Sequence, residues 1–261
     1  MHQLPIEQQV LLIAQIAALL ALSIRMWLTG LYKIYTNFFG YLILEFLQAL
    51  IPLFVPLQSG LYRDFFVVSQ ALIVAFYALV VLELYSVILR NLEGIASVAR
   101  RYMKITLALA IVLSVLPLTI EKTPHTPTGY LFIFERPILS SLVAFVLLIS
   151  GFLVYYPVPL GRNVLVFLAG YALYFPMIAT MAFLQNLGYF WNRQKGNVDM
   201  GVSLACLIFW GFALSRQGEE RRVVVGHQWN PADEQRLLAQ LEAINASLLR
   251  SSRKKIDVSS S

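Results

Sequence analysis

Charged residues are scarce in this sequence: Asp, Glu, Lys and Arg make up only 13% of its 261 residues, whereas 59% are hydrophobic. Soluble proteins have about twice that share of charge. The composition therefore excludes an ordinary water-exposed surface and indicates a membrane protein. The net charge of +6 is spread over short segments between apolar runs and over the C-terminal region, so it predicts membrane topology rather than nucleic-acid binding.

Cysteine and histidine are almost absent. The single cysteine, Cys206, cannot form an intrachain disulfide, and it lies in an apolar run where a small buried hydrophobe is its expected role. The three histidines, His2, His125 and His227, all fall outside the apolar runs. A pair of haem ligands or a histidine metal cluster within the membrane is therefore excluded, and we expect neither a cofactor nor a metal.

Apart from Lys104 at the edge of the fourth run, the predicted spans also contain no lysine, and they contain no aspartate. A Schiff base of the retinal type and an intramembrane pair of aspartates are therefore excluded. A serine or cysteine nucleophile would lack a histidine partner at the same depth. These absences make an enzyme the least favoured function, although the sequence leaves that function open.

Seven long apolar runs are present instead. Each is close to the ~20 residues needed to cross a hydrocarbon core of ~30 Å, so we predict an all-α polytopic membrane bundle of about seven transmembrane helices over residues 1–215. The N-terminal segment lacks the positive region of a secretory signal, and the first run is therefore expected to be a span. The runs cover residues 8–28, 36–57, 65–89, 104–120, 131–154, 164–187 and 200–215.

The distribution of Lys and Arg predicts the orientation of the bundle. With seven spans and the N-terminus outside, fifteen Lys and Arg residues fall on the inner side and five on the outer side. Without the eight in the C-terminal region, the margin narrows to seven against five. The positive-inside rule then predicts a multi-pass protein with its C-terminus in the cytoplasm.

The C-terminal region predicts a short cytoplasmic helix. Residues 216–229 form a polar connector, residues 230–255 an amphipathic helix capped by Asn230, and residues 256–261 a disordered tail. One apolar seam runs along the helix, formed by Leu237, Leu241, Ile244 and Leu248. The helix either docks a protein partner or a second copy of the chain, or it lies on the anionic inner leaflet; the spacing favours docking.

Ionisable groups within the apolar runs define a candidate intramembrane polar site. Glu45 and Glu83 lie in the second and third runs, and Gln48 shares a helical face with Glu45. One interpretation makes the glutamates proton-binding or cation-binding groups that face a cavity. The other makes them structural, either paired with arginines such as Arg25 or snorkelling to the interface. We favour the structural interpretation because both glutamates lie off-centre.

A candidate pocket lies on the sixth run. Tyr171, Tyr174, Met181 and Gln185 share one face of this helix, and Pro176 interrupts the backbone hydrogen bonds beside them. Such a kink can open a ligand pocket. Packing in the bundle core is the favoured alternative, since aromatic and methionine side chains usually fill such cores.

Several stretches together resemble an uncharacterised family of bacterial seven-helix integral membrane proteins. They are LELYSVILRNLEGIASVARR, YYPVPLGRNV, GVSLACLIFWGFALSRQGEE and NPADEQRLLAQLEAINASLLRSSRK, in the order expected of that family. The resemblance implies the fold, the topology and a bacterial inner membrane, and it carries no activity. The helix count is similar to that of the seven-helix input modules of bacterial sensor kinases, although these 261 residues include no kinase domain.

These observations favour a sensory or interaction (scaffold) protein of the inner membrane, with a tail helix that contacts a cytoplasmic partner. The missing catalytic groups and the capped tail helix motivate this hypothesis. The alternative is a proton-coupled or cation-coupled small-molecule transporter that uses Glu45, with or without Glu83. Lipid is the expected partner of the bundle in either case, and nucleic acid is not expected.

Overall fold

Long helices make up most of the protein. The computed structural model describes residues 5–56, 59–89, 105, 127–156, 158–186, 192–220, 222–224 and 231–259. Six of its helices are long and apolar enough to cross a membrane. They are α1 (Ile6–Thr29), α2 (Thr36–Phe54), α3 (Gly60–Ile88), α5 (Pro127–Tyr155), α6 (Arg162–Asn186) and α7 (Asn192–Ala213).

These six helices correspond to six of the seven predicted runs. The protein is therefore a helical, multi-pass membrane protein, as the scarcity of charge predicts. The fourth predicted run, 104–120, lies outside the described residues apart from Ile105.

The start of α7 corrects one prediction. The helix begins at Asn192, eight residues before the predicted run at 200, and the apolar span begins at Gln194. Lys195 and Asp199 therefore lie inside a candidate span, and the prediction that the spans contain no lysine and no aspartate is wrong. The two side chains form an ion pair of 2.8 Å one helical turn apart. This pairing within one helix lowers the cost of placing both charges in the span, a local effect that hydrophobicity alone does not register.

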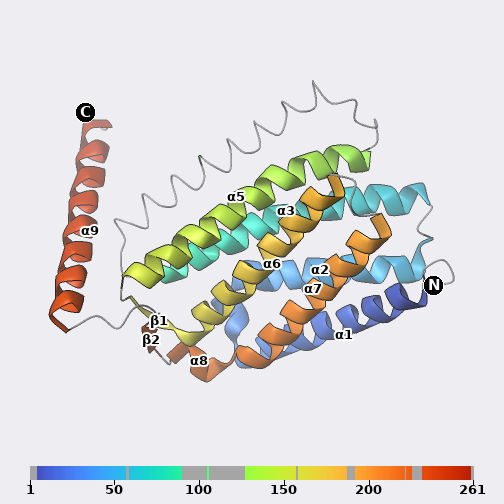
Figure 1. Ribbon diagram of the computed structural model, residues 1–261, viewed down its shortest axis with the longest axis horizontal. Coiled ribbons are helices and arrows are strands. Elements are labelled where there is room, and N and C mark those ends of the chain that lie inside the picture. The colour runs from blue at the N-terminus through green and yellow to red at the C-terminus, as the bar shows by residue number, and fades with distance from the viewer. Residues whose placement is uncertain are drawn as a thin grey trace.

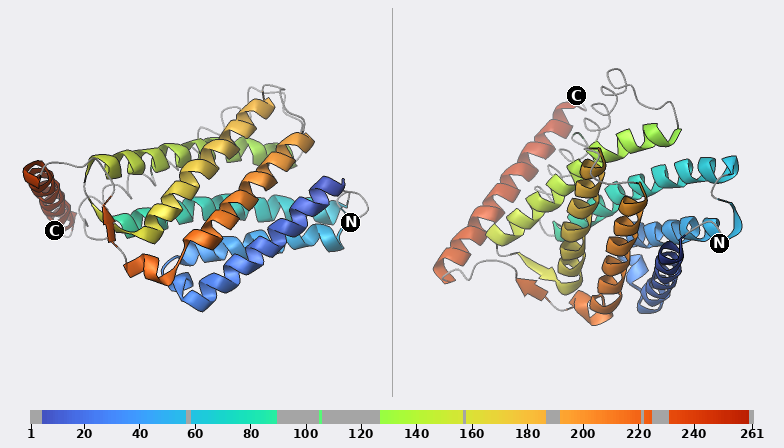
Figure 2. Two further views of the ribbon diagram at one scale, coloured as in Figure 1. Left: turned by 60° about the horizontal axis from the view of Figure 1, so that its bottom comes forward. Right: turned by 45° about the vertical axis from the view of Figure 1, so that its right-hand side comes forward.

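The spanning helices form one bundle with two distinct ends (Figure 1). We call the end at which α1 begins the N-terminal end; α3, α5 and α7 also begin there, whereas α2 and α6 run the opposite way. α1 packs against α2 and α7, and α6 packs against α5 and α7. α3 and α5 are neighbours that run in the same direction (Figure 2). Gln70 donates to Glu135 toward the start of both helices, and the Tyr85 hydroxyl donates to the carbonyl of Phe145 further along.

Short elements build the opposite end, which we call the tail end. They are the 3₁₀ turn η1 (Leu31–Lys33), the strands β1 (Pro159–Gly161) and β2 (Arg222–Val224), and the helix α8 (Arg216–Glu220). β1 and β2 pair antiparallel. Gly30 ends α1 with a φ of 74°, a left-handed conformation that glycine adopts without steric cost, so the chain turns sharply into η1.

A layer of aromatic side chains fills the bundle between its two ends. Phe38, Phe167, Tyr171 and Trp210 are all buried, and the Phe38 ring lies 4.8 Å from Phe167 and 5.1 Å from Trp210 between centroids. The indole of Trp210 occupies the space beside Gly170, where a Cβ atom would overlap it. α6 and α7 therefore pack closely because this position has no side chain.

The tail helix α9 (Pro231–Ser259) stands apart from the bundle (Figure 1). It extends through Ser259, beyond the predicted end at residue 255. Its apolar seam is divided: Leu237 and Leu241 are buried, whereas Ile244 is 44% exposed and Leu248 is half-buried. The first half of the seam is thus used within the chain, and Ile244 in the second half is open to solvent.

Candidate functional site

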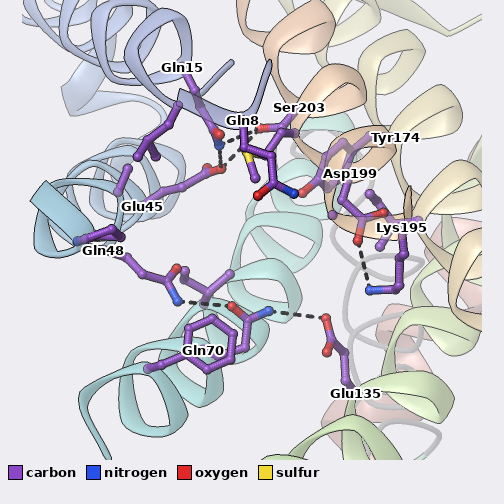
Figure 3. Close-up of a pocket in the computed structure, with 18 of the residues that line it drawn as sticks. Gln8, Gln15, Glu45, Gln48, Gln70, Glu135, Tyr174, Lys195, Asp199 and Ser203 are labelled. Atoms are coloured by element: carbon purple, nitrogen blue, oxygen red, sulfur yellow. Dashed lines mark hydrogen bonds and ion pairs between the residues drawn. The ribbon is translucent and has the colours of Figure 1, made fainter. Parts of the chain in front are cut away.

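A cavity of about 500 Å³ lies at the N-terminal end of the bundle, between α1, α2, α3, α5, α6 and α7 (Figure 3). Its polar lining is unusual for a membrane bundle, since ionisable groups within spans are rare and costly. Apolar side chains such as Leu12, Ile73 and Ile178 fill the spaces between the polar groups. The polar lining comprises Gln8, Gln15, Glu45, Gln48, Gln70, Glu135, Lys195, Asp199 and Ser203.

Glu45 is a buried carboxylic side chain of the cavity. It is 8% exposed, and its Oε1 accepts hydrogen bonds from Gln15 Nε2 at 3.0 Å and from Ser203 Oγ at 3.1 Å. α1, α2 and α7 are therefore joined at this carboxylate. The Tyr41 hydroxyl interacts electrostatically with it, but the second oxygen, Oε2, is buried without a hydrogen-bond partner in the described part of the chain.

Two further sets of polar side chains line the walls of the cavity. Gln48 donates to Gln70 at 3.2 Å, and Gln70 donates to Glu135 at 3.3 Å, so one chain of hydrogen bonds links α2, α3 and α5. At the right of Figure 3, above Glu135, lies the ion pair of Lys195 with Asp199 Oδ2. The other oxygen of Asp199, Oδ1, is also buried without a partner among the described residues.

Tyrosines form the floor of the cavity. The hydroxyls of Tyr77 and Tyr174 are 2.7 Å apart, and both residues line the cavity. Tyr77 packs against Phe175, and Tyr171 below it belongs to the aromatic layer with Trp210. In the described residues, the cavity therefore ends on buried aromatic rings rather than continuing toward the tail end.

The predicted intramembrane polar site is divided between the two ends of the bundle. Glu45 and Gln48 line the cavity, whereas Glu83 and Arg25 do not. Glu83 on α3 accepts hydrogen bonds from the backbone N–H groups of Asn37 and Phe38, at 3.0 and 3.2 Å. α2 has no side-chain cap of its own, so this carboxylate satisfies its first N–H groups and complements the positive end of its dipole.

Arg25 has a comparable role at the C-terminal end of α7. Its guanidinium donates to the carbonyls of Gly211 and Leu214, at the C-terminal end of α7. Positive charge is favourable there because the last carbonyls of a helix lack intrahelical donors. Arg25 therefore joins the end of α1 to the end of α7.

The candidate pocket on α6 is also only partly at the cavity. Tyr174 lines it, together with Ile178 on the same face. Tyr171 is 1% exposed and belongs to the aromatic layer instead. Met181 is half-buried and is not part of the cavity lining, and the side chain of Gln185 lies outside the described residues.

Sequence reasoning missed three ionisable groups of the cavity: Glu135, Lys195 and Asp199. Glu135 falls within the fifth predicted run, so examining every acidic residue of each run would have found it. Lys195 and Asp199 fall between the sixth and seventh predicted runs because the segment that contains them is polar. Their i, i+4 spacing was the available signal that the helix begins earlier.

A second polar cluster lies at the tail end. Asn163 is fully buried and donates to the carbonyl of Ser215 and to Glu219, and the Tyr35 hydroxyl also donates to Glu219 at 3.0 Å. Burial raises the pKa of Tyr35 well above its usual value, and the charge of Glu219 raises it further, so the hydroxyl stays protonated and donates. These contacts tie α8 to the starts of α2 and α6.

The protein is thus a helical, multi-pass membrane protein. Its bundle has a polar cavity at one end, and tyrosines close the inner end of that cavity. Comparison with protein-family models, with curated proteins and with solved structures found no match for this chain.

Proposed function

We propose that the protein is a sensory membrane protein whose cavity takes a small ligand and whose tail helix contacts a cytoplasmic partner. The observation that supports this most directly is the course of α7. Asp199 and Ser203 of α7 line the cavity, and the other end of the same helix carries the carbonyls held by Arg25. The chain then continues through α8 and β2 to α9. One helix thus runs from the cavity to the tail end of the bundle, where α8 and β2 follow it.

Within the described residues, the cavity ends on tyrosines and does not continue through the bundle, which favours a receptor over a transporter. The transporter alternative uses Glu45, with or without Glu83, on a path through the bundle. Asn37, whose N–H contacts Glu83, precedes Glu45 by eight residues, or about 12 Å along α2. Glu83 is occupied as a helix cap, and the tyrosines and the aromatic layer lie between the cavity and the tail end.

We further propose seven spans, with the N-terminus outside and the tail in the cytoplasm of a bacterial cell. α3 and α5 run in the same direction, which supports an odd number of crossings between them, and the run 104–120 is the candidate. The excess of Lys and Arg at the tail end supports the orientation.

Cysteine labelling tests this orientation. Cys206 is 2% exposed, so the wild-type protein is expected to react little with a membrane-impermeant maleimide. Ala243→Cys places a thiol on an exposed position of α9. We expect it to be labelled in inside-out vesicles from a bacterial host and to be protected in intact spheroplasts. Labelling in intact spheroplasts contradicts the orientation.

The tail is tested by Ile244→Asp in the full chain. Ile244 is exposed on the seam of α9, and a charge there is expected to reduce crosslinking and co-purification of the cytoplasmic partner at least about tenfold, as for a buried interface anchor. Ala246→Asp introduces the same side chain on the opposite, exposed face of α9 and serves as the matched control. An identical set of co-purifying proteins for the wild type and both variants argues against the proposed role.

A further inference from the structure

We infer that the ligand of the cavity is a small organic ammonium ion. This inference rests on the proposed function, in which the cavity is a ligand site. Three features of the cavity lining indicate the ligand class: the charge of the lining, the buried acceptor atoms and the aromatic walls.

The charge of the lining favours a cation. Three carboxylic side chains face the cavity, from Glu45, Glu135 and Asp199, against one ammonium group, that of Lys195. Lys195 is engaged with Asp199 at 2.8 Å. A cavity with an excess of negative groups in a surrounding of low dielectric attracts positive ligands and repels anions.

The buried acceptor atoms require hydrogen-bond donors. Glu45 is more than nine-tenths buried, and its Oε2 lacks a partner among the described residues, as does Oδ1 of Asp199. Carboxylate oxygens only accept, so a ligand that satisfies them must bring N–H or O–H groups. An alkylammonium brings three N–H donors together with the positive charge, and the resulting hydrogen bonds are of the strong, charge-assisted kind.

The size and walls of the cavity distinguish an organic cation from a metal ion. A volume of about 500 Å³ is far larger than an ion requires, and it falls within the range of small-molecule sites. In the part of the chain that the structure describes, no group of three or more His, Cys, Asp or Glu side chains is arranged to hold a metal. The rings of Tyr62, Phe66, Tyr77 and Tyr174 line the cavity, and aromatic faces attract organic cations.

Calorimetric titration of the purified full chain in detergent tests the inference with three probes of similar size. These are n-butylammonium, the neutral 1-pentanol and the anion butyrate. We expect saturable binding of n-butylammonium, at least about tenfold weaker binding of 1-pentanol, and no saturable binding of butyrate. Butyrate binding as tightly as n-butylammonium overturns the inference.

Variants locate the binding. Glu45→Gln is nearly isosteric and is expected to weaken n-butylammonium binding at least about tenfold, because the charge-assisted hydrogen bond is lost. Glu220→Gln makes the same change on an exposed residue of α8 at the tail end and is expected to bind like the wild type. Asp199→Asn provides the same test should Glu45→Gln fail to fold. Wild-type affinity in the cavity variants, or an equal loss in Glu220→Gln, overturns the inference.

Vesicle uptake separates this inference from the proposed receptor function. Saturable binding of n-butylammonium without uptake into reconstituted vesicles supports both. Binding with Glu45-dependent uptake supports the ammonium site but overturns the receptor function in favour of transport. Failure of n-butylammonium to bind overturns the ammonium class alone, because the tail variants Ile244→Asp and Ala246→Asp test the receptor function independently of any ligand.

Discussion

Gly170→Ala is expected to destabilise the purified protein by about 1–3 kcal/mol, the usual cost of overpacking a filled core. The added Cβ atom would overlap the indole of Trp210, which is 2% exposed and lies within 5.1 Å of Phe38 between ring centroids. The indole has no free space to move into without displacing the aromatic layer. Thermal unfolding in detergent, followed by circular dichroism, measures the effect as a lower melting temperature.

Gly211→Ala is the matched control for this substitution. Gly211 lies in α7 next to Trp210, and a Cβ atom there would meet nothing within 4 Å. Alanine also has the higher helix propensity, so this control is expected to melt at or slightly above the wild-type temperature. Adding Trp210→Phe to Gly170→Ala should recover part of the loss. Equal melting temperatures for Gly170→Ala and Gly211→Ala would contradict the proposed close packing of α6 on α7.

Glu83→Ala is expected to cost about 1–3 kcal/mol, because the N–H groups of Asn37 and Phe38 at the start of α2 lose their acceptor. In a bilayer, water cannot readily replace it. Glu83→Gln keeps one acceptor oxygen but no charge, so we expect an intermediate loss. The same unfolding experiment measures both variants.

Glu220→Ala removes a carboxylate from an exposed position of α8 and is the control for charge loss. Its free energy of unfolding is expected to lie within about 0.5 kcal/mol of the wild-type value, as is usual for surface substitutions. If Glu83→Ala melts like Glu220→Ala, the carboxylate of Glu83 does not stabilise α2. Ammonium binding should survive Glu83→Gln in any case, because Glu83 does not line the cavity.

The sequence identifies Glu83 as unusual but does not reveal its partners. A glutamate inside an apolar run is unusual, and the sequence singled it out for that reason. Its partners are two backbone N–H groups that lie 46 and 45 residues away in the chain. Backbone groups leave no trace in a residue pattern, so the expected partner was an arginine instead. The partners of Arg25 are also backbone groups, the carbonyls at the end of α7, and a residue pattern does not reveal them either.

The cavity was predictable only in part. The common face of Glu45 and Gln48 follows from helical periodicity, and both residues do line it. The contributions of Lys195 and Asp199 depend on where α7 begins, and their ion pair lowers the cost of placing both charges in that helix. Glu135 joins through Gln70 because α3 and α5 pack against each other, and no pattern within either helix shows that they are neighbours.

The sequence by itself determined that this is a helical membrane protein, because hydrophobicity is a local property that adds up along each run and lipid accepts only runs of sufficient length. It also determined the start of the tail helix and its apolar seam. Only the tertiary structure decided which polar groups meet. Gln15 and Ser203 are 188 residues apart in sequence and join at one carboxylate, that of Glu45. Contacts between helices depend on how the surfaces of whole helices fit together, and the residue pattern within a single helix does not reveal that fit.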